Sequence, residues 1–405
     1  MLYSFVIPTR ERHDVLGAAM RAVLAQTRDN LELVVMDNAS SSATKDVIDS
    51  FNDPRIRHVR APERLPMIDN WEMGLAQARG DYVTILGDDD GPLPDALEVA
   101  EKVHAVWPDK ILTWRISVYY WPDFYIPEFR NQANVHLGRH LELRNSRDFL
   151  RKLYTYKDQA NFSELPSLYY SFVPRPLIDR IRTKYGRYFL SKSPDIASGL
   201  VNAWHVDDYV FSYRPVSVLG ISRHSTGTSA LFPGLHAGPA EQFKAENAAA
   251  IPEDLDPRLS DKTYLLEVFV ANELARFRDK YFPDDAIKPD MAAWLQWFAT
   301  AAPRFGDKRG ELEALIEEIA RKNGLSADRV KMPPAQDMSK ASSFLYFVGK
   351  HQSVFFRYTI GPHIADIAQM TAEYARMATP VDEIVVPSAT RVSARDRIAR
   401  LLQRR

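Results

Sequence analysis

The chain has 405 residues, a formal net charge of -1 and 45% hydrophobic residues, which is ordinary for a soluble globular protein of one or two domains. The balanced charge gives no overall field that would attract nucleic acid, and the absence of cysteine excludes disulfides, thiolate catalysis and cysteine-bound zinc. The N-terminal run is too short and uncharged for a secretory signal, and no apolar stretch approaches the roughly 18 residues of a spanning helix. We therefore expect a cytoplasmic protein with no nucleic-acid partner.

The first 110 residues alternate short β-rich runs with segments of helical spacing, a pattern typical of βαβ units and a mainly parallel sheet. We expect strands at residues 3–7, 31–36, 55–59 and 82–86. We expect helices at residues 12–26, 43–51, 67–79 and 95–106, the first and third from apolar side chains on one face and the other two from helix-start signals. This region is therefore predicted to be an α/β unit.

Beyond residue 110 the pattern changes. Residues 111–121 alternate and are rich in aromatic side chains, residues 141–200 mix short helices with loops, and residues 204–221 are predicted to form one or two strands. A link rich in glycine and proline at residues 226–239 precedes predicted helices at 261–281, 291–301, 308–322 and 364–377. We divide the chain into a domain of residues 1–235, with halves 1–110 and 111–235, and a mainly helical region of residues 236–405.

Three adjacent carboxylates, Asp88, Asp89 and Asp90, follow the apolar strand candidate at residues 82–86. Buried carboxylates repel one another, so such a cluster is tolerated mainly where a cation neutralises it. Mg2+ and Mn2+ take oxygen ligands of this kind, often shared with substrate phosphates. The alternative is a solvated acidic turn, because glycine and proline follow at once.

The first two predicted strands also end in polar residues, Thr9-Arg10 and Asp37. Ligands of open α/β sheets bind beyond the carboxyl ends of the strands. Asp37 can accept hydrogen bonds from a ribose or base, and Thr9 and Arg10 can hold a base edge or a phosphate. Each residue alone also fits a turn or loop, so the prediction of a binding crevice depends on the convergence of the three strand ends.

Four segments in order carry a resemblance: residues 6–10 (VIPTR), 33–40 (LVVMDNAS), 78–83 (ARGDYV) and 86–90 (LGDDD). Together they resemble the family 2 glycosyltransferases of the GT-A fold, well over the first 110 residues and weakly to about residue 225. The resemblance implies a Rossmann-like, mostly parallel sheet flanked by helices. It also implies a nucleotide-diphosphate sugar donor, with Pro8, Thr9, Arg10 and Asp37 near the nucleoside, and Mn2+ or Mg2+ at the acidic run.

The acidic run departs from the family pattern, since many members have aspartate where this chain has Gly87. We therefore expect Asp89 and Asp90 to be the metal ligands and Asp88 to contact ribose or act through a water. The resemblance further suggests His224, in a loop with glycines on both sides, as a metal ligand. The alternative for this histidine is a solvated loop residue.

Two arginines are candidates for contact with the donor diphosphate. Arg64 lies in a loop before the predicted helix at residues 67–79, and Arg223 lies beside the histidine of the glycine-flanked loop. A solvated position is an equal alternative for Arg64. A loop that carries Arg223 can also close over a bound donor.

An inverting transfer needs a base that takes the acceptor's hydroxyl proton. The family supplies an acidic residue at a helix start after the mixed-strand region, and Asp195, in Ser-Pro-Asp, fits that place. The alternative is a first-turn carboxylate that stabilises its own helix. The pair Asp207-Asp208 competes for the role, but it runs directly into a predicted strand.

The predicted activity is metal-dependent, inverting transfer of a sugar from a nucleotide-diphosphate sugar, most often UDP-linked in this family, to a saccharide or lipid-linked acceptor in surface glycan synthesis. The alternatives are a non-catalytic nucleotide-sugar binding or scaffold protein, and a sugar-1-phosphate nucleotidyltransferase. The loop at residues 8–13 has none of the glycines that a nucleotidyltransferase would use to grip phosphate.

Three further expectations concern surfaces. Aromatic residues at 114–125 fit either an acceptor-binding face or the core. The basic amphipathic helix predicted at residues 391–405 can lie on an anionic membrane surface or remain solvated. The helical C-terminal region can also form a homo-oligomer interface.

Overall fold

The computed structural model describes residues 1–225, 245, 255–260, 265–305, 308–334 and 364–387, and the main chain of strands Leu345–Val348 and Ser353–Thr359. The predicted link at residues 226–239, the domain boundary near residue 235 and the basic tail at residues 391–405 lie outside the described residues. The division into two regions therefore stays a prediction.

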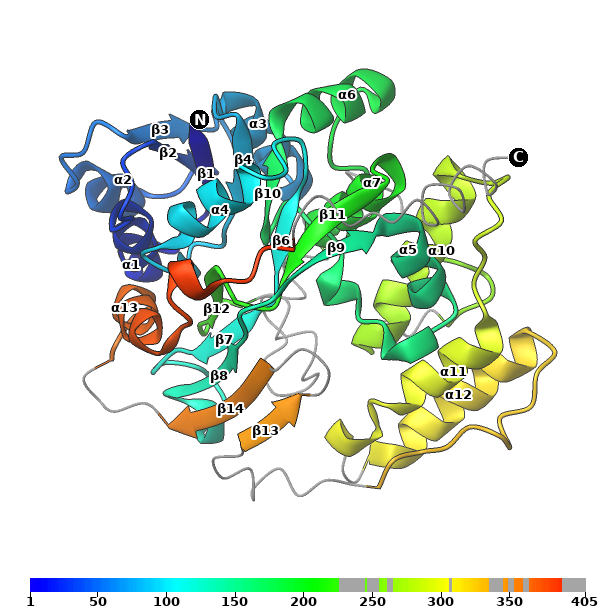
Figure 1. Ribbon diagram of the computed structural model, residues 1–405. Helices are drawn as coiled ribbons and strands as arrows, with labels where there is room; N and C mark the ends of the chain where they lie inside the picture. Colours follow the sequence, from blue (N-terminus) through cyan, green and yellow to red (C-terminus); the bar gives the residue numbers. More distant parts are fainter. Residues whose placement is uncertain are drawn as a thin grey trace.

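The first 110 residues form the predicted α/β unit (Figure 1). Its strands are β1 (Tyr3–Thr9), β2 (Leu31–Asp37), β3 (Ile56–Arg60) and β4 (Tyr82–Ile85). Its helices are α1 (His13–Leu24), α2 (Ser42–Asp49), α3 (Met67–Gln77) and α4 (Ala96–His104). All eight elements are confirmed, and the four strands are parallel in the order β3-β2-β1-β4.

The sheet continues beyond β4 with strands from the second hundred residues. These are β10 (Ser171–Pro174), β6 (Leu112–Trp114), β11 (Asp208–Ser212) and β9 (Leu141–Asn145), in that order. β10 is antiparallel to β4 and to β6, so β6 and its parallel neighbour β11 run in the same direction as β4. The predicted fold class, a mainly parallel α/β sheet flanked by helices, is confirmed.

A second sheet has the order β13-β14-β8-β7-β12-β5. Its strands include β5 (Gly91–Pro92), β7 (Ser117–Tyr120), β8 (Gln132–Leu137) and β12 (Ser217–Ile221). β13 (Leu345–Val348) and β14 (Ser353–Thr359) come from the region expected to be mainly helical and were not predicted. β14 pairs with β8, so this part of the chain returns to the sheets of the N-terminal domain.

Helices cover both faces of the first sheet because side chains alternate along its strands. Val6 and Val34 face one core with the C-terminal helices α10 (Leu266–Tyr281), α11 (Met291–Ala299) and α12 (Arg309–Lys322). Phe5 and Ile7 face the other core, which α13 (Ile367–Met377) shares; this helix lies beside α1 in Figure 1. The remaining helices are α5 (Ser146–Tyr154), α6 (Arg175–Tyr185) and α7 (Pro194–His205).

One predicted boundary is wrong. The strand expected to begin at residue 204 begins at Asp208, because Trp204 belongs to the last turn of α7. There its ring stacks on Phe282 with centroids 4.3 Å apart, so core packing and not strand pairing decides its conformation. Among the described helices, none has both the length and the apolar character needed to cross a membrane.

Candidate functional site

The acidic triplet connects the two sheets. Asp88, Asp89 and Asp90 leave the carboxyl end of β4 and lead at once into β5, which belongs to the second sheet. The three residues are 2%, 5% and 0% exposed. The alternative of a solvated acidic turn is therefore wrong, and the burial of three carboxylates calls for compensating charge.

Asp88 is held by the end of β1 and the loop that follows it. The hydroxyl of Thr9 donates to Oδ2 of Asp88 over 2.7 Å, and the guanidinium of Arg12 donates to Oδ1 over 3.0 Å. Arg12 also donates to the main-chain oxygen of His224 over 2.7 Å. Burial would lower the pKa of Arg12, but the charges of Asp88 and Asp89 outweigh it and raise that pKa, so Arg12 supplies a lasting positive charge.

Asp89 and Asp90 keep a charge that Arg12 does not fully offset. Burial, followed by the charge of Asp88, raises the pKa of Asp89; burial, followed by Asp89, raises the pKa of Asp90. A divalent cation would favour the ionised form of both carboxyl groups.

One oxygen of each of these carboxylates lies beside Gly87. A Cβ atom on Gly87 would lie 2.9 Å from Oδ2 of Asp90 and 3.1 Å from Oδ1 of Asp89. The other oxygen of Asp89, Oδ2, accepts hydrogen bonds from the N–H and hydroxyl of Ser222, whereas no hydrogen bond is recorded for Oδ1 within the described chain. Asp89 and Asp90 therefore fit a hard divalent cation that takes its remaining ligands from substrate or water.

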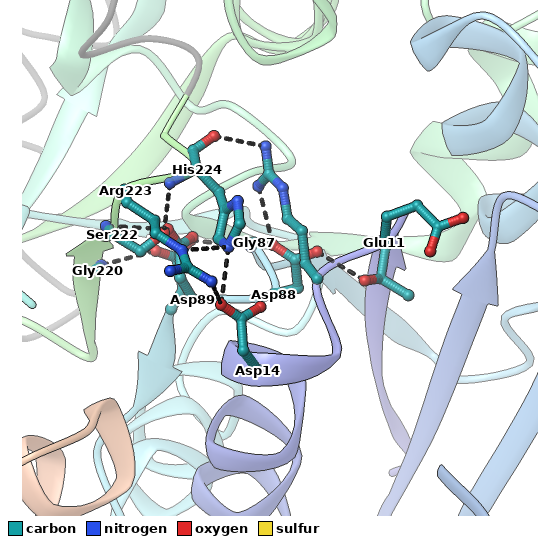
Figure 2. Close-up of polar contacts among 12 residues, drawn as sticks. Glu11, Asp14, Gly87, Asp88, Asp89, Gly220, Ser222, Arg223 and His224 are labelled. Carbon is teal, nitrogen blue, oxygen red and sulfur yellow. Dashed lines mark hydrogen bonds and ion pairs between the residues drawn. The ribbon is translucent and has the colours of Figure 1, made fainter. Parts of the chain in front are cut away.

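The structure does not bring His224 to these two carboxylates. Its Nε2 lies 2.9 Å from Oδ2 of Asp14, in the first turn of α1, and Arg223 donates to the same oxygen over 2.7 Å (Figure 2). Within the described residues, no group of three or more acidic or histidine side chains is arranged as a metal site. A ligand role for His224 stays a prediction and requires the ring to leave Asp14.

The residues expected at the nucleoside lie on neighbouring strands. Pro8 and Thr9 end β1, and Thr9 pairs directly with Asp37 at the end of β2. Asp37 is fully buried and ion-paired with Arg60; burial would raise its pKa, but its contacts with His58, Ser40 and Arg60 lower it. The pairing that holds Asp37 makes it a rigid acceptor at this edge.

The two loops beyond these strands adopt unusual backbone conformations. Glu11 and Ala39 have φ values of +53° and +51°, which non-glycine residues adopt only where the surroundings impose it. Arg10, half-buried, directly precedes Glu11. Arg64 is 62% exposed and lies 3.5 Å from Glu11, so both its predicted diphosphate contact and its solvated alternative remain compatible with its place.

Asp195 lies in the first turn of α7, as predicted. The residue is exposed to solvent. The protein around its carboxyl group still removes part of the water from it, and this desolvation raises the pKa of the carboxyl group. Its main-chain oxygen accepts from the hydroxyls of Ser167 and Ser198, over 2.7 and 3.0 Å. An accessible carboxylate with a raised pKa on a fixed main chain is suited to proton transfer.

The candidate base Asp195 and the acidic triplet both act on one side chain, that of Tyr170. Burial and the charges of Asp90 and Asp195 raise the pKa of Tyr170, so both carboxylates act on this phenol. The competing acid Asp208 begins β11, as the sequence predicted, and is ion-paired with Lys110.

The aromatic stretch mostly belongs to the core. Trp114, Tyr119, Trp121 and Phe124 are at most 5% exposed, so the core interpretation is confirmed for these four side chains. The indole N–H of Trp121 donates to the main-chain oxygen of Asp89 over 3.2 Å, which makes this core residue a support of the acidic triplet.

Gly220 in β12 lies against the main chain of the acidic triplet. Its N–H donates to Oδ1 of Asp90 over 2.8 Å, and a Cβ atom here would overlap the carbonyl group of Asp89 and lie 2.7 Å from Nε1 of Trp121. We expect Gly220→Ala to lower the free energy of unfolding by about 3 kcal/mol or more, measured by denaturant titration.

The control for this substitution is Gly310→Ala. No atom lies within 4 Å of a Cβ on Gly310, in the first turn of α12, so alanine there should stabilise the protein by about 0.5 to 1 kcal/mol. Equal effects of the two substitutions would contradict the close approach at Gly220.

Residues 4–161 match the family model described as Glycosyl transferase family 2. GalNAc(5)-diNAcBac-PP-undecaprenol beta-1,3-glucosyltransferase of Campylobacter jejuni is 35% identical over 97 residues, which are 23% of this chain and 31% of that protein. Abequosyltransferase RfbV of Salmonella typhimurium is 34% identical over 107 residues, 25% of this chain and 32% of that protein. The chain thus spans about a third of the length of these curated relatives.

Among solved structures, Staphylococcus aureus TarS 1-349 in complex with UDP-GlcNAc is 13% identical, with a TM-score of 0.45 over 86% of this chain and 95% of that one. Mannosyltransferase PcManGT from Pyrobaculum calidifontis, in complex with GDP-Man and Mn2+, is 17% identical, with a TM-score of 0.40 over 79% and 86%. At these TM-scores neither structure bears on the substrate or cofactor of this chain.

The family match begins at β1 and extends through α5, so it includes the acidic triplet and both polar strand ends. Residues 4–161 therefore carry a region that matches glycosyl transferase family 2, and the resemblance of the four sequence segments is confirmed.

Proposed function

We propose that this protein is a glycosyltransferase that moves a sugar from a nucleotide-diphosphate sugar to a saccharide or lipid-linked acceptor. UDP is the carrier that we expect from the family. The observation that carries the proposal is the burial of the adjacent carboxylates of Asp89 and Asp90 at a strand end, inside the segment that matches the family. Carboxylate pairs of this kind hold Mn2+ or Mg2+ together with substrate phosphates.

The donor would lie along the edge formed by β1, β2 and β4. In this proposal Pro8, Thr9, Arg10 and Asp37 contact the nucleoside, and Asp88 contacts ribose or a water. When bound at Asp89 and Asp90, Mn2+ or Mg2+ supplies charge that stabilises the departing diphosphate. The arginines proposed to assist at the diphosphate are Arg64 and Arg223.

Asp195 is proposed to remove the proton of the acceptor hydroxyl while its oxygen bonds to the sugar carbon and displaces the nucleoside diphosphate from the opposite face, and this single displacement inverts the carbon. Its exposed surface and raised pKa support this role. Relatives from Campylobacter jejuni and Escherichia coli are named for diphosphate-linked undecaprenol acceptors, which supports a lipid-linked acceptor in surface glycan synthesis.

A thermal-shift panel tests the donor and cation together. We expect one of UDP, GDP, CDP and dTDP to raise the melting temperature in the presence of Mn2+ and to have little effect with a chelator. The matching nucleoside monophosphate is the control, since it lacks the second phosphate that would share the cation. Stabilisation that is equal with and without Mn2+, or absent for all four diphosphates, contradicts the proposal.

A non-catalytic nucleotide-sugar binding protein is the second candidate. It is favoured by the contact of His224 with Asp14, because the ring of this expected ligand is held by Asp14. Release of free sugar from the donor identified by the panel separates the two functions, because a binding protein would not hydrolyse it.

A further inference from the structure

The space in front of Gly87 is filled by a side chain that is distant in sequence. A Cβ atom on Gly87 would lie 2.5 Å from the hydroxyl oxygen of Tyr169. The same hydroxyl donates to Oδ2 of Asp90 over 2.7 Å, and the N–H of Gly87 donates to that oxygen over 2.9 Å. Glycine at position 87 is therefore required by the tyrosine, because any larger side chain would displace the phenol.

We propose that Tyr169 is a positioning residue of the cation site, whose hydroxyl takes the place of a side chain at position 87 and holds the carboxylate of Asp90 toward Asp89. Tyr169 contributes a hydrogen bond where an acidic side chain would add a further negative charge to the triplet. The inference rests on the proposed function for the identity of the site, but its geometry stands on the contacts of Tyr169 alone.

The ring of Tyr169 is held rigidly. The ring stacks on Trp71 with centroids 5.4 Å apart and planes inclined by 29°. The main-chain N–H of Tyr169 donates to the hydroxyl of Ser167 over 3.1 Å. A tyrosine hydroxyl is protonated at neutral pH, so it can donate to Oδ2 of Asp90. The same Ser167 binds the main chain of Asp195, so one short segment fixes both the cation site and the candidate base.

Tyr169→Phe removes only the hydroxyl, and its effect is measured as the affinity for Mn2+ alone, from the electron paramagnetic resonance signal of unbound Mn2+. We expect the affinity to fall about 10-fold or more, as for the loss of a partner that orients a metal ligand. Tyr185→Phe is the matched control, because the hydroxyl of Tyr185 lies 3.1 Å from Nε2 of His205 and not beside the acidic triplet. Equal affinities of wild type and Tyr169→Phe, or no Mn2+ binding by the wild type, would overturn the inference.

A second measurement does not depend on the metal. Gly87→Ala should lower the melting temperature more in the wild type than in the Tyr169→Phe background, because the phenol hydroxyl meets the new methyl group only in the former. Additive effects would show that the two positions do not share space and would overturn the inference.

These results separate the inference from the proposed function. Transfer activity with unchanged Mn2+ affinity in Tyr169→Phe contradicts the role of Tyr169 alone. Reduced Mn2+ affinity and coupled stability in a protein that transfers no sugar contradict the proposed function alone.

Discussion

Asp89→Asn is expected to abolish cation-dependent binding of a nucleoside diphosphate and to lower kcat/KM by about 10² to 10³. The substitution is well matched to the site. The amide oxygen of asparagine can accept both hydrogen bonds that Ser222 gives to Oδ2, and the amide nitrogen takes the place of Oδ1, for which no partner is recorded in the described chain. The change therefore removes a charge and a cation ligand while it leaves the local packing in place.

The same substitution should stabilise the protein when no cation is present. Burial raises the pKa of Asp89 in the folded state, so between its usual value and the raised one the folded protein holds a proton that the unfolded chain has released. Stability then decreases as pH rises through this window, and the ionised carboxylate destabilises the fold above it. Asparagine does not ionise, so its melting temperature with a chelator should exceed that of the wild type by about 2 °C or more near neutral pH, with a smaller difference at low pH.

Asp29→Asn is the control for both measurements. Asp29 is 98% exposed and lies 3.4 Å from Arg55, and exposed ion pairs of this kind contribute little to stability. A loss of activity in Asp29→Asn, or a lower melting temperature for Asp89→Asn without cation, would contradict the assignment of Asp89 as a buried carboxylate that binds a cation.

The arrangement of the donor edge could be predicted from the sequence because it follows from local rules. Alternating strands and helices predict a parallel sheet, and the carboxyl ends of parallel strands meet at one edge. Thr9 and Asp88 are 79 residues apart, yet convergence of β1 and β4 at this edge was enough to expect them together, and their side chains form a hydrogen bond. Burial of the acidic triplet decided between the two interpretations that the sequence left open.

The partners of the triplet were not predicted because they depend on tertiary packing. Arg12 follows Arg10 by two residues, and nothing local indicates that its guanidinium, rather than that of Arg10, reaches Asp88. Tyr169 precedes β10, an antiparallel strand inserted between β4 and β6, and only this insertion places its hydroxyl beside Asp90. The contact of His224 with Asp14 likewise joins residues 210 positions apart.

Asp195→Asn is expected to lower the rate of sugar transfer by about 10² to 10⁴ while the affinity for the donor nucleotide stays within about twofold. The carboxylate has no side-chain hydrogen bond recorded among the described residues, and the main chain of Asp195 is fixed by Ser167 and Ser198. The variant should therefore keep the position of α7 and lose only the proton acceptor. Single-turnover transfer and equilibrium binding of the nucleoside diphosphate measure the two quantities separately.

The raised pKa of Asp195 gives this prediction a second readout. Because the base must be ionised, the transfer rate of the wild type should decrease as pH falls through the raised pKa, and the small residual rate of Asp195→Asn should lack this acidic limb. Asp207→Asn, a change at the exposed acid next to β11, is the control and should keep both the rate and the limb. A loss of donor binding in Asp195→Asn would show instead that this carboxylate belongs to the donor site, and an unaltered limb would assign the proton transfer to another group.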